Sequence, residues 1–216
     1  MLYANTRDND KVEAFPDGEG FCPECRRPLR AKCGDVIVWH WAHIAQSGCP
    51  HGAGETAWHL GWKSLVRKEH CEVKLGEHRA DIVGNGGLVV ELQNSPITAW
   101  EIRKREEHYK SMVWVFNAEG YSDNIDLRVR NGYISFRWKW PRQYQTEVRA
   151  PLFWDFGHAM KARDSVGREV RGNHMFLVKK LYGTGGYGEF VDKRWFKQTF
   201  LSEVLKPQFT GARAPV

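Results

Sequence analysis

A hairpin pattern near the middle of the chain constrains the fold more than any other feature of the sequence. The glycine-rich turn 84–87 separates two stretches in which apolar and polar residues alternate. Turn residues between alternating stretches predict an antiparallel hairpin, with strands at about 78–83 and 88–93. The second strand should place Glu91 and Gln93 on one face, because side chains alternate along a strand.

The length of the loop decides whether this hairpin can form a site. A three-residue loop pairs Gly84 with Leu88, which puts Asp81 directly opposite Glu91. Two facing carboxylates repel unless a cation lies between them, and Mg²⁺ suits such oxygen ligands. A two-residue turn would shift the register by one and turn Asp81 away. Gly87 favours the longer loop, which needs a left-handed residue. A polar strand face exposed to water is the plain alternative.

A helix is predicted before the hairpin, at 54–69. Glu55, His59 and Lys63 recur at every fourth position and so form one polar stripe beside an apolar one. Alone, such a stripe is typical of a solvated helix face with weak ion pairs. Beside the hairpin, it supplies a third acid and two groups that can be cationic.

A second helix is predicted after the hairpin, starting with Ser95 as N-cap and Pro96 at the first helical position. The order from residue 54 is therefore helix, three strands, helix, strand. Other segments give weaker signals. The predicted elements are strands at 71–75, 112–116 and 133–140, helices at 95–111 and 194–205, a flexible glycine turn at 183–188 and a loose tail at 207–216.

The cysteines indicate metal binding and not a disulfide framework, because their number, five, is odd. Cys22-Pro-Glu-Cys25 has the spacing of a zinc knuckle, and His40-x2-His43 follows it. Cys49 can replace one histidine, with His40 the favoured one to be replaced, and Cys33 is a weaker candidate. Reduced thiols without metal are the alternative. The sequence predicts structural Zn²⁺ on four of five residues: Cys22, Cys25, His40, His43 and Cys49.

The excess of positive over negative charge lies entirely in the second half of the chain. Residues 1–120 hold 15 Lys and Arg against 17 Asp and Glu, whereas residues 121–216 hold 17 against 9. In this half, Arg137, Lys139 and Arg142 alternate with tryptophans, a chemistry that holds nucleic acid strands. An ordinary basic surface over core tryptophans is the alternative. No apolar run spans a membrane and no secretory signal is evident, so we expect a cytoplasmic protein.

A series of short motifs in this chain resembles that of CoiA-like competence proteins. The motifs are Glu55-x3-His59-x3-Lys63, Arg79-Ala-Asp81, Glu91-Leu-Gln93-x-Ser95-Pro-Ile and Arg105-x3-Tyr109, with His40-Trp-Ala-His43 behind the cysteine pair. The resemblance covers roughly residues 20–117. It implies a nuclease domain of the PD-(D/E)xK superfamily, with a restriction-endonuclease-like αβββαβ core behind an N-terminal zinc-binding module and before a basic C-terminal extension. The corresponding domain ranges are 1–52, 53–120 and 121–216.

The resemblance also implies roles for the residues of the site. Asp81 and Glu91 would bind catalytic Mg²⁺ or Mn²⁺ with the Leu92 carbonyl, and Glu55 would complete the shell. Gln93, where the superfamily often has Lys, would position the attacking water. His59 and Lys63 would face the scissile phosphate. Arg105 and Tyr109 would brace the site or contact the DNA strand. No Pro precedes Asp81, a mild departure from the superfamily pattern.

The expected function is therefore Mg²⁺-dependent DNA hydrolysis, as an endonuclease more than an exonuclease. A non-catalytic DNA-binding or recombination accessory protein with the same fold is the alternative, and a zinc-dependent protein-interaction adaptor is a third. DNA is the expected partner and a membrane is not. A homodimer and recombination or defence partners stay open at this point, as does the form of DNA.

Overall fold

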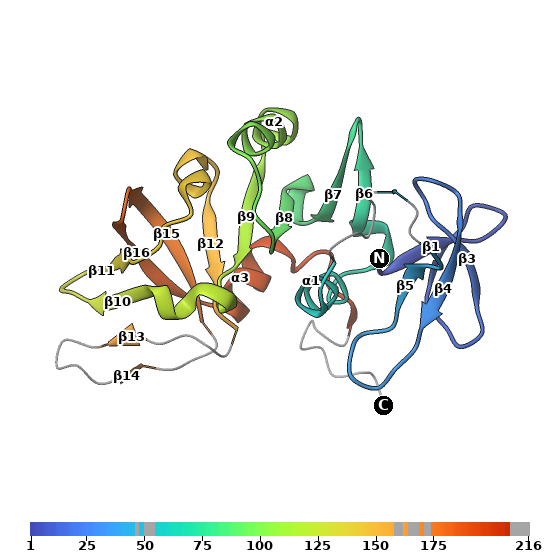
Figure 1. Cartoon of the computed structure of the whole chain (residues 1–216), viewed down its shortest axis with the longest axis horizontal. Coiled ribbons are helices and arrows are strands. Elements are labelled where there is room, and N and C mark those ends of the chain that lie inside the picture. Colours follow the sequence, from blue (N-terminus) through green and yellow to red (C-terminus); the bar gives the residue numbers. More distant parts are fainter. Residues whose placement is uncertain (46–47, 50–54, 158–161, 164–168, 171–173, 208–216) are drawn as a thin grey trace. The chain divides into compact units, whose positions relative to one another are not determined.

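The computed structural model describes residues 1–216 except 46–47, 50–54, 158–161, 164–168, 171–173 and 208–216. The chain divides into two compact units (Figure 1): unit 1 comprises Met1–Lys74 with Val204–Val216, and unit 2 comprises Leu75–Glu203. The domain ranges given above stay predictions, and the predicted loose tail lies outside the described residues from residue 208 on. No helix among the described residues is long and apolar enough to cross a membrane.

Unit 1 contains a five-stranded antiparallel sheet with the order β2-β1-β3-β4-β5. Trp41 of the edge strand β5 is fully buried in the core of this unit, where it packs with Leu29, Ala4 and Cys22. Truncating a buried Trp to Ala costs about 3–5 kcal/mol, so this ring dominates a small core. The elements are β1 (Tyr3–Asn5), β2 (Lys11–Glu13), β3 (Glu19–Phe21), β4 (Pro28–Lys32), β5 (His40–His43), α1 (Ala57–Lys63) and η1 (Lys68–His70).

Unit 2 contains a larger, mixed sheet with the order β14-β13-β10-β11-β16-β15-β12-β9-β8-β7. The boundary between the units falls within β6 (Cys71–Leu75). The elements of unit 2 are β7 (His78–Val83), η2 (Asn85–Gly87), β8 (Val89–Gln93), α2 (Ala99–Tyr109), β9 (Met112–Asn117), η3 (Glu119–Asn124), β10 (Ile125–Val129), β11 (Ile134–Trp138), η4 (Gln143–Glu147), β12 (Leu152–Asp155), β13 (Ala162–Arg163), β14 (Glu169–Val170), β15 (His174–Tyr182), β16 (Gly185–Asp192) and α3 (Lys193–Phe200).

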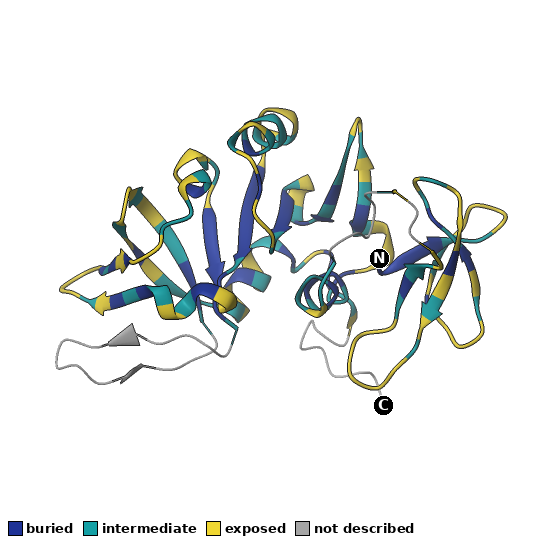
Figure 2. Cartoon of the chain, viewed as in Figure 1, coloured by how far each residue is buried: buried dark blue, intermediate teal, exposed yellow. Residues whose placement is uncertain are grey.

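Three neighbouring strands of the larger sheet, β12, β9 and β8, are parallel and largely apolar. β9 pairs in parallel with β8 on one side and with β12 on the other. Both β9 and β12 are buried over most of their length, as the dark blue arrows in Figure 2 show. A strand covered on both faces needs a continuous apolar run, which is what Met112–Phe116 provides. The fold is thus mixed α/β and consists mostly of strands.

The predicted order of helix, three strands, helix and strand is confirmed by α1, β6, β7, β8, α2 and β9. The larger sheet continues past residue 120, where the predicted nuclease core ends. β12, β15, β16, β11 and β10 continue the sheet beyond β9, and Trp138 and Trp154 are buried in its core. The described residues between 121 and 203 therefore belong to the same packed unit as β8 and β9.

The first helix is shorter than predicted. α1 ends at Lys63, whereas the sequence predicted a helix to residue 69. The reason is a backbone pairing inside unit 1: the Arg67 N–H donates to the Val204 carbonyl at 2.9 Å, and the Lys206 N–H donates to the Leu65 carbonyl at 2.8 Å. Residues held in such a bridge cannot continue a helix.

The second helix begins later than predicted. Its N-cap is Thr98, whose side chain accepts from the Glu101 N–H at 3.1 Å, and the Glu101 carboxylate accepts from the Thr98 N–H in return. Such a capping box contributes about 1 kcal/mol. The carbonyl of Ser95, the predicted N-cap, instead accepts from the Gln93 amide.

The sequence predicted a flexible turn at the glycine segment 183–188, but most of this segment is a strand. Only Gly183 and Thr184 form the turn between β15 and β16. A Cβ on Gly186 would lie 2.6 Å from the ring of Phe136, and one on Gly188 would lie 2.6 Å from the ring of Phe176. Glycine is required there because buried rings pack directly against the backbone.

Candidate functional site

The hairpin of β7 and β8 has the register that brings the two predicted acids together. Ile82 pairs with Val90 and Val83 with Val89, and the Gly84 N–H donates to the Leu88 carbonyl at 2.7 Å. The paired residues end at Ile82 and Val90, and the same register continued by one residue sets Asp81 opposite Glu91. The loop is the three-residue type, with positive φ at Gly86 (59°) and Gly87 (79°), so the two-residue alternative is wrong.

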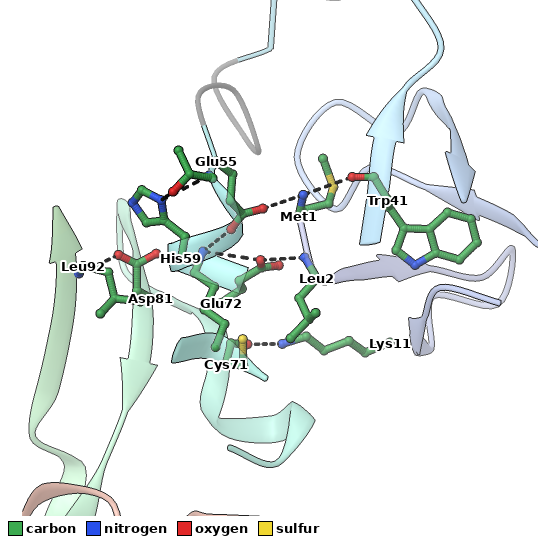
Figure 3. A network of polar contacts seen from close by, with 12 residues as sticks. Met1, Leu2, Lys11, Trp41, Glu55, His59, Cys71, Glu72, Asp81 and Leu92 are labelled. Atoms are coloured by element: carbon green, nitrogen blue, oxygen red, sulfur yellow. Dashed lines mark hydrogen bonds and ion pairs between the residues drawn. The ribbon is translucent and has the colours of Figure 1, made fainter. Parts of the chain in front are cut away.

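The two acids are held in different ways. The Asp81 carboxylate, half-buried, accepts a hydrogen bond from the Leu92 N–H at 2.9 Å (Figure 3). The Glu91 side chain is fully buried and forms an ion pair with Arg105 of α2. Arg105 thus contacts Glu91 directly, and its predicted role in bracing the site or touching the strand stays a prediction.

Burial and charge around Glu91 also act on its neighbours. Burial opposes the charge of Arg105, but Glu91 and Asp81 outweigh it and raise the pKa of Arg105 above its usual range. Burial, and then the charge of Glu91, raise the pKa of Tyr109, one helical turn after Arg105. Both groups thus stay protonated, and the Arg105 guanidinium donates to the Glu91 carboxylate.

Gln93 lies on the same strand as Glu91 with its amide turned back on the chain. Its Nε2 donates to the Ser95 carbonyl at 2.6 Å and to the Ser95 Oγ at 3.4 Å. The family resemblance implies that Gln93 positions the attacking water. In this conformation the amide fixes the bend that leads into α2.

The predicted polar stripe of the first helix is only partly formed. Glu55 precedes the N-cap Thr56 and so lies outside α1, which contradicts the predicted helical stripe. His59 closes a capping box, in which its Nδ1 accepts from the Thr56 N–H at 3.2 Å. Lys63 is the last helical residue and is buried.

Glu55 and Lys63 belong to a buried ion-pair network in unit 1 (Figure 3). The Lys63 ammonium lies 2.6 Å from Glu55 and 3.5 Å from Glu72, and the amino group of Met1 lies 2.5 Å from Glu55. Burial opposes ionisation, yet Lys63 and the amino group lower the pKa of Glu55 to about 2. The contacts therefore give Glu55 and Lys63 a structural role.

We expect Glu55→Gln to destabilise unit 1 by about 3 kcal/mol, because it leaves the Lys63 charge buried with less compensation. A carboxylate with a lowered pKa stabilises the fold above its unfolded pKa, near 4.5, and loses that contribution as the pH falls toward 2. Urea unfolding between pH 3 and 7 measures both effects. Glu69→Gln, at an exposed ion pair with Arg67, should change stability by less than about 0.5 kcal/mol. Equal effects of the two substitutions would contradict the buried network.

A second cluster, in unit 1, consists of Cys22, Cys25, His43 and Cys49. Their ligand atoms all lie within 4.8 Å of one another, and no other group of three or more His, Cys, Asp and Glu side chains gathers in this way among the described residues. The Cys22 and Cys49 sulfurs are 3.8 Å apart, and the Cys25 sulfur is 3.4 Å from His43 Nε2. Tetrahedral zinc with Zn–S bonds of about 2.3 Å separates two sulfurs by about 3.8 Å. The four side chains fit a zinc ion.

The knuckle and a strand end position these ligands. The Arg26 N–H donates to the Cys22 carbonyl at 2.9 Å, and Arg26 has a φ of 61°, which closes the turn around the two cysteines. Donation from the Arg27 backbone N–H, and then the nearby His43, lower the pKa of Cys25 to about 6, whereas burial raises that of Cys22 to about 11. A bound cation would favour both thiolates.

His40 lies outside the cluster, and the strand explains why. His40 and His43 are three residues apart on β5, so their side chains point to opposite faces of the sheet. His40 Nδ1 instead lies 2.9 Å from the Val38 carbonyl. The cluster therefore contains Cys49 and not His40, and zinc binding by these four side chains stays a prediction. Cys33 packs against the core of unit 1.

The predicted DNA-holding segment 137–142 is divided between surface and core. Trp138 is buried and stacks on Tyr121 with 5.4 Å between ring centroids. Arg142 is half-buried over the same Tyr121 ring, at 4.2 Å. Arg137 and Lys139 are exposed. The segment does not form one continuous stacking surface.

The comparisons with known proteins concern the N-terminal part of the chain. Residues 4–52 match the family model described as competence protein CoiA, N-terminal domain. No curated protein and no solved structure matches the chain. The matched range contains the cysteine knuckle, His43 and Cys49, and it ends before the hairpin of β7 and β8. The chain is therefore similar to CoiA competence proteins over this N-terminal segment.

Proposed function

We propose that the chain is a metal-dependent DNA nuclease in which Asp81 and Glu91 bind a divalent cation, Mg²⁺ or Mn²⁺. The observation that supports the proposal is the hairpin register of Ile82 with Val90, which, continued by one residue, sets Asp81 opposite Glu91. Arg105 supplies one positive charge against these two negative ones. The net negative charge that is left suits a hard cation held by one or two carboxylates and water.

The arrangement of strands around the hairpin supports the proposal. β7 and β8 are antiparallel, β8 and β9 are parallel, and α2 connects β8 to β9. This is the connectivity expected of a restriction-endonuclease-like αβββαβ core. The proposed roles of Glu55, His59 and Lys63 at the phosphate stay predictions, so the proposal rests on unit 2.

The chain's own residues would prepare the hydrolysis. A divalent ion, when bound, polarises a phosphoryl oxygen and lowers the pKa of a water molecule. The Leu92 N–H fixes the Asp81 carboxylate and Arg105 fixes that of Glu91, so both acids are oriented before a metal binds. Gln93 would release the Ser95 carbonyl to orient the attacking water. Direct attack by water needs no covalent intermediate on the chain.

We propose a structural role for zinc at Cys22, Cys25, His43 and Cys49. Four protein ligands fill a tetrahedral shell, which leaves no position for a substrate or a reacting water. The ion would hold the cysteine knuckle, the end of β5 and the segment at Cys49 together.

Cleavage of covalently closed circular DNA tests the proposal. We expect the purified chain to nick or linearise a plasmid with Mg²⁺ or Mn²⁺ and not with EDTA, and Asp81→Asn to lower the rate at least about a thousandfold. Glu77→Gln, at an exposed position just before β7, is the matched control and should keep the rate. Full activity of Asp81→Asn, or binding of DNA with no cleavage, would overturn the proposal; the second result would favour the non-catalytic accessory protein.

A further inference from the structure

The outer face of four neighbouring strands in unit 2 carries an unusual set of side chains. β10, β11, β16 and β15 lie side by side in this order (Figure 1). Their inner face packs Leu127, Phe136 and Phe176 into the core. The opposite face therefore carries the alternating residues, because side chains alternate along a strand.

The register places these outer residues in rows across the strands. Asp126 lies opposite Arg137, and Arg128 lies opposite Ser135. The rows continue onto the next strands, where Arg137 pairs with Gly185 and Ser135 with Tyr187. They end on β15, where Gly185 pairs with Tyr182 and Tyr187 with Lys180. Four strands span about 14 Å at about 4.8 Å per strand spacing, which is wide enough for several nucleotides of an extended strand.

The β10–β11 side of this face forms a basic hollow. Its volume is about 390 Å³, and arginines line it, with a single acid; the lining residues are Asp126, Arg128, Arg130, Ser135, Phe136 and Arg137. Arg128 pairs with Asp126 at 2.6 Å, and the Arg130 Nε donates to the Ser135 hydroxyl at 3.2 Å. Within the described part of the chain, Arg137 has no ion-pair or hydrogen-bond partner. The hollow thus keeps a net positive charge.

The β16–β15 side of the face carries tyrosine rings. Tyr182 of β15 and Tyr187 of β16 are exposed at 53% and 38%, and Tyr133, just before β11, is exposed at 49%. Tyr133 meets Tyr187 edge to face with 6.1 Å between centroids, and the Lys180 ammonium lies 6.0 Å from the Tyr182 ring centroid. Exposed aromatic rings on a sheet surface leave a large apolar area in contact with water, and a stacked planar group would bury that area. Lys179 and Glu189, near the bulge of β15, pair with each other at 2.9 Å and add no net charge.

We propose that this face, defined by Arg128, Arg130, Arg137, Lys180, Tyr133, Tyr182 and Tyr187, binds single-stranded nucleic acid. Phosphates lie in the arginine hollow and unpaired bases stack on the tyrosine rings. A duplex keeps its bases stacked inside and can offer only phosphates, so the rings select a single strand. Gly185, between Arg137 and Tyr182, keeps the route between hollow and rings open because it has no side chain. This site is separate from the acids of the hairpin and does not depend on cleavage.

Binding of a labelled dT20 oligonucleotide, followed by fluorescence anisotropy in EDTA, tests this inference without cleavage. We expect the chain to bind dT20 at least about tenfold more tightly than a duplex of equal length. Tyr182→Ala with Tyr187→Ala should weaken dT20 binding at least about tenfold and leave the salt dependence unchanged, because stacking releases no counterions. Arg128→Gln with Arg137→Gln should weaken binding and lower the slope of log affinity against log salt by about 1.4, from about 0.7 for each phosphate contact. An rU20 arm shows whether DNA or RNA is preferred, and binding of either strand supports the site.

Matched controls separate this face from general surface effects. Arg149→Gln with Arg194→Gln removes the same charge from exposed positions of unit 2 outside the face, and Trp195→Ala removes an exposed ring from α3. Both should keep dT20 affinity within about twofold. Equal losses in the controls, preference for duplex, or wild-type affinity of the tyrosine variant would each overturn the inference. These binding results do not test the nuclease proposal, because that proposal is tested by metal-dependent cleavage.

Discussion

Glu91→Gln is expected to abolish metal-dependent cleavage of DNA, with a loss of at least about a thousandfold. The substitution removes one of two charged metal ligands, and losing about 4 kcal/mol of transition-state stabilisation corresponds to this factor. It also leaves Arg105 beside a neutral group in a largely buried place. We therefore expect a parallel loss of about 2–3 kcal/mol in the free energy of unfolding, measured with urea.

The double variant Glu91→Gln with Arg105→Met separates a metal ligand from a structural ion-pair partner. Removing both charges should restore most of the stability, since replacing a buried ion pair by neutral groups is often nearly neutral. If Glu91 binds the metal, the double variant stays inactive although it is stable. Recovered cleavage in the double variant would show that Glu91 serves only to neutralise Arg105, and the metal site would then have to be abandoned.

The hairpin could be predicted because its determinants are local. Gly86 and Gly87 both adopt positive φ, which fixes the three-residue loop, and the loop fixes the register of the acids. A one-residue shift would turn Val90 and Leu92, both buried, to the other face. Loop and burial therefore specify the same register, and sequence alone contains both signals.

The end of α1 and the start of α2 could not be predicted, because both depend on contacts that are not evident from the sequence. α1 stops because residues 204–206 pair with the backbone at 65–67, a partner more than 130 positions away. α2 starts at Thr98 because its capping box outcompetes the Ser95-Pro96 signal, while the Ser95 carbonyl is taken by Gln93. Such tertiary and side-chain competition decides between two acceptable local signals.

The predicted DNA-binding role of the second half of the chain rested on its composition. The positions of its side chains in the sheet give a different set of exposed residues. Trp138 stacks in the core instead of facing a strand of DNA, because it lies on the inner face of β11. Arg128 and Arg130 were missed, although the alternation Asp126-Leu-Arg-Val-Arg130 already places their side chains together on one face of a strand. Which side of the sheet is covered could not be inferred without the partner strands β11, β15 and β16.

Removal of zinc is expected to unfold unit 1, the second large effect. The four ligands come from the knuckle, the end of β5 and Cys49, and the small core around Trp41 joins these same segments. Structural zinc contributes about 10–16 kcal/mol in comparable small modules, more than a core of this size supplies alone. A strong chelator should therefore abolish the cooperative thermal transition of unit 1, followed by circular dichroism, and added Zn²⁺ should restore it.

The two histidines of β5 provide a matched pair for this prediction. His43→Ala removes a ligand, so we expect less than about a tenth of the wild-type zinc content and loss of the unit 1 transition. His40→Ala, on the opposite face of the same strand, should keep one zinc ion per chain and shift stability by no more than about 1 kcal/mol. Metal analysis of the purified variants distinguishes them. Zinc retained by His43→Ala and lost by His40→Ala would reverse the ligand assignment, because strand geometry allows only one of the two to face the knuckle.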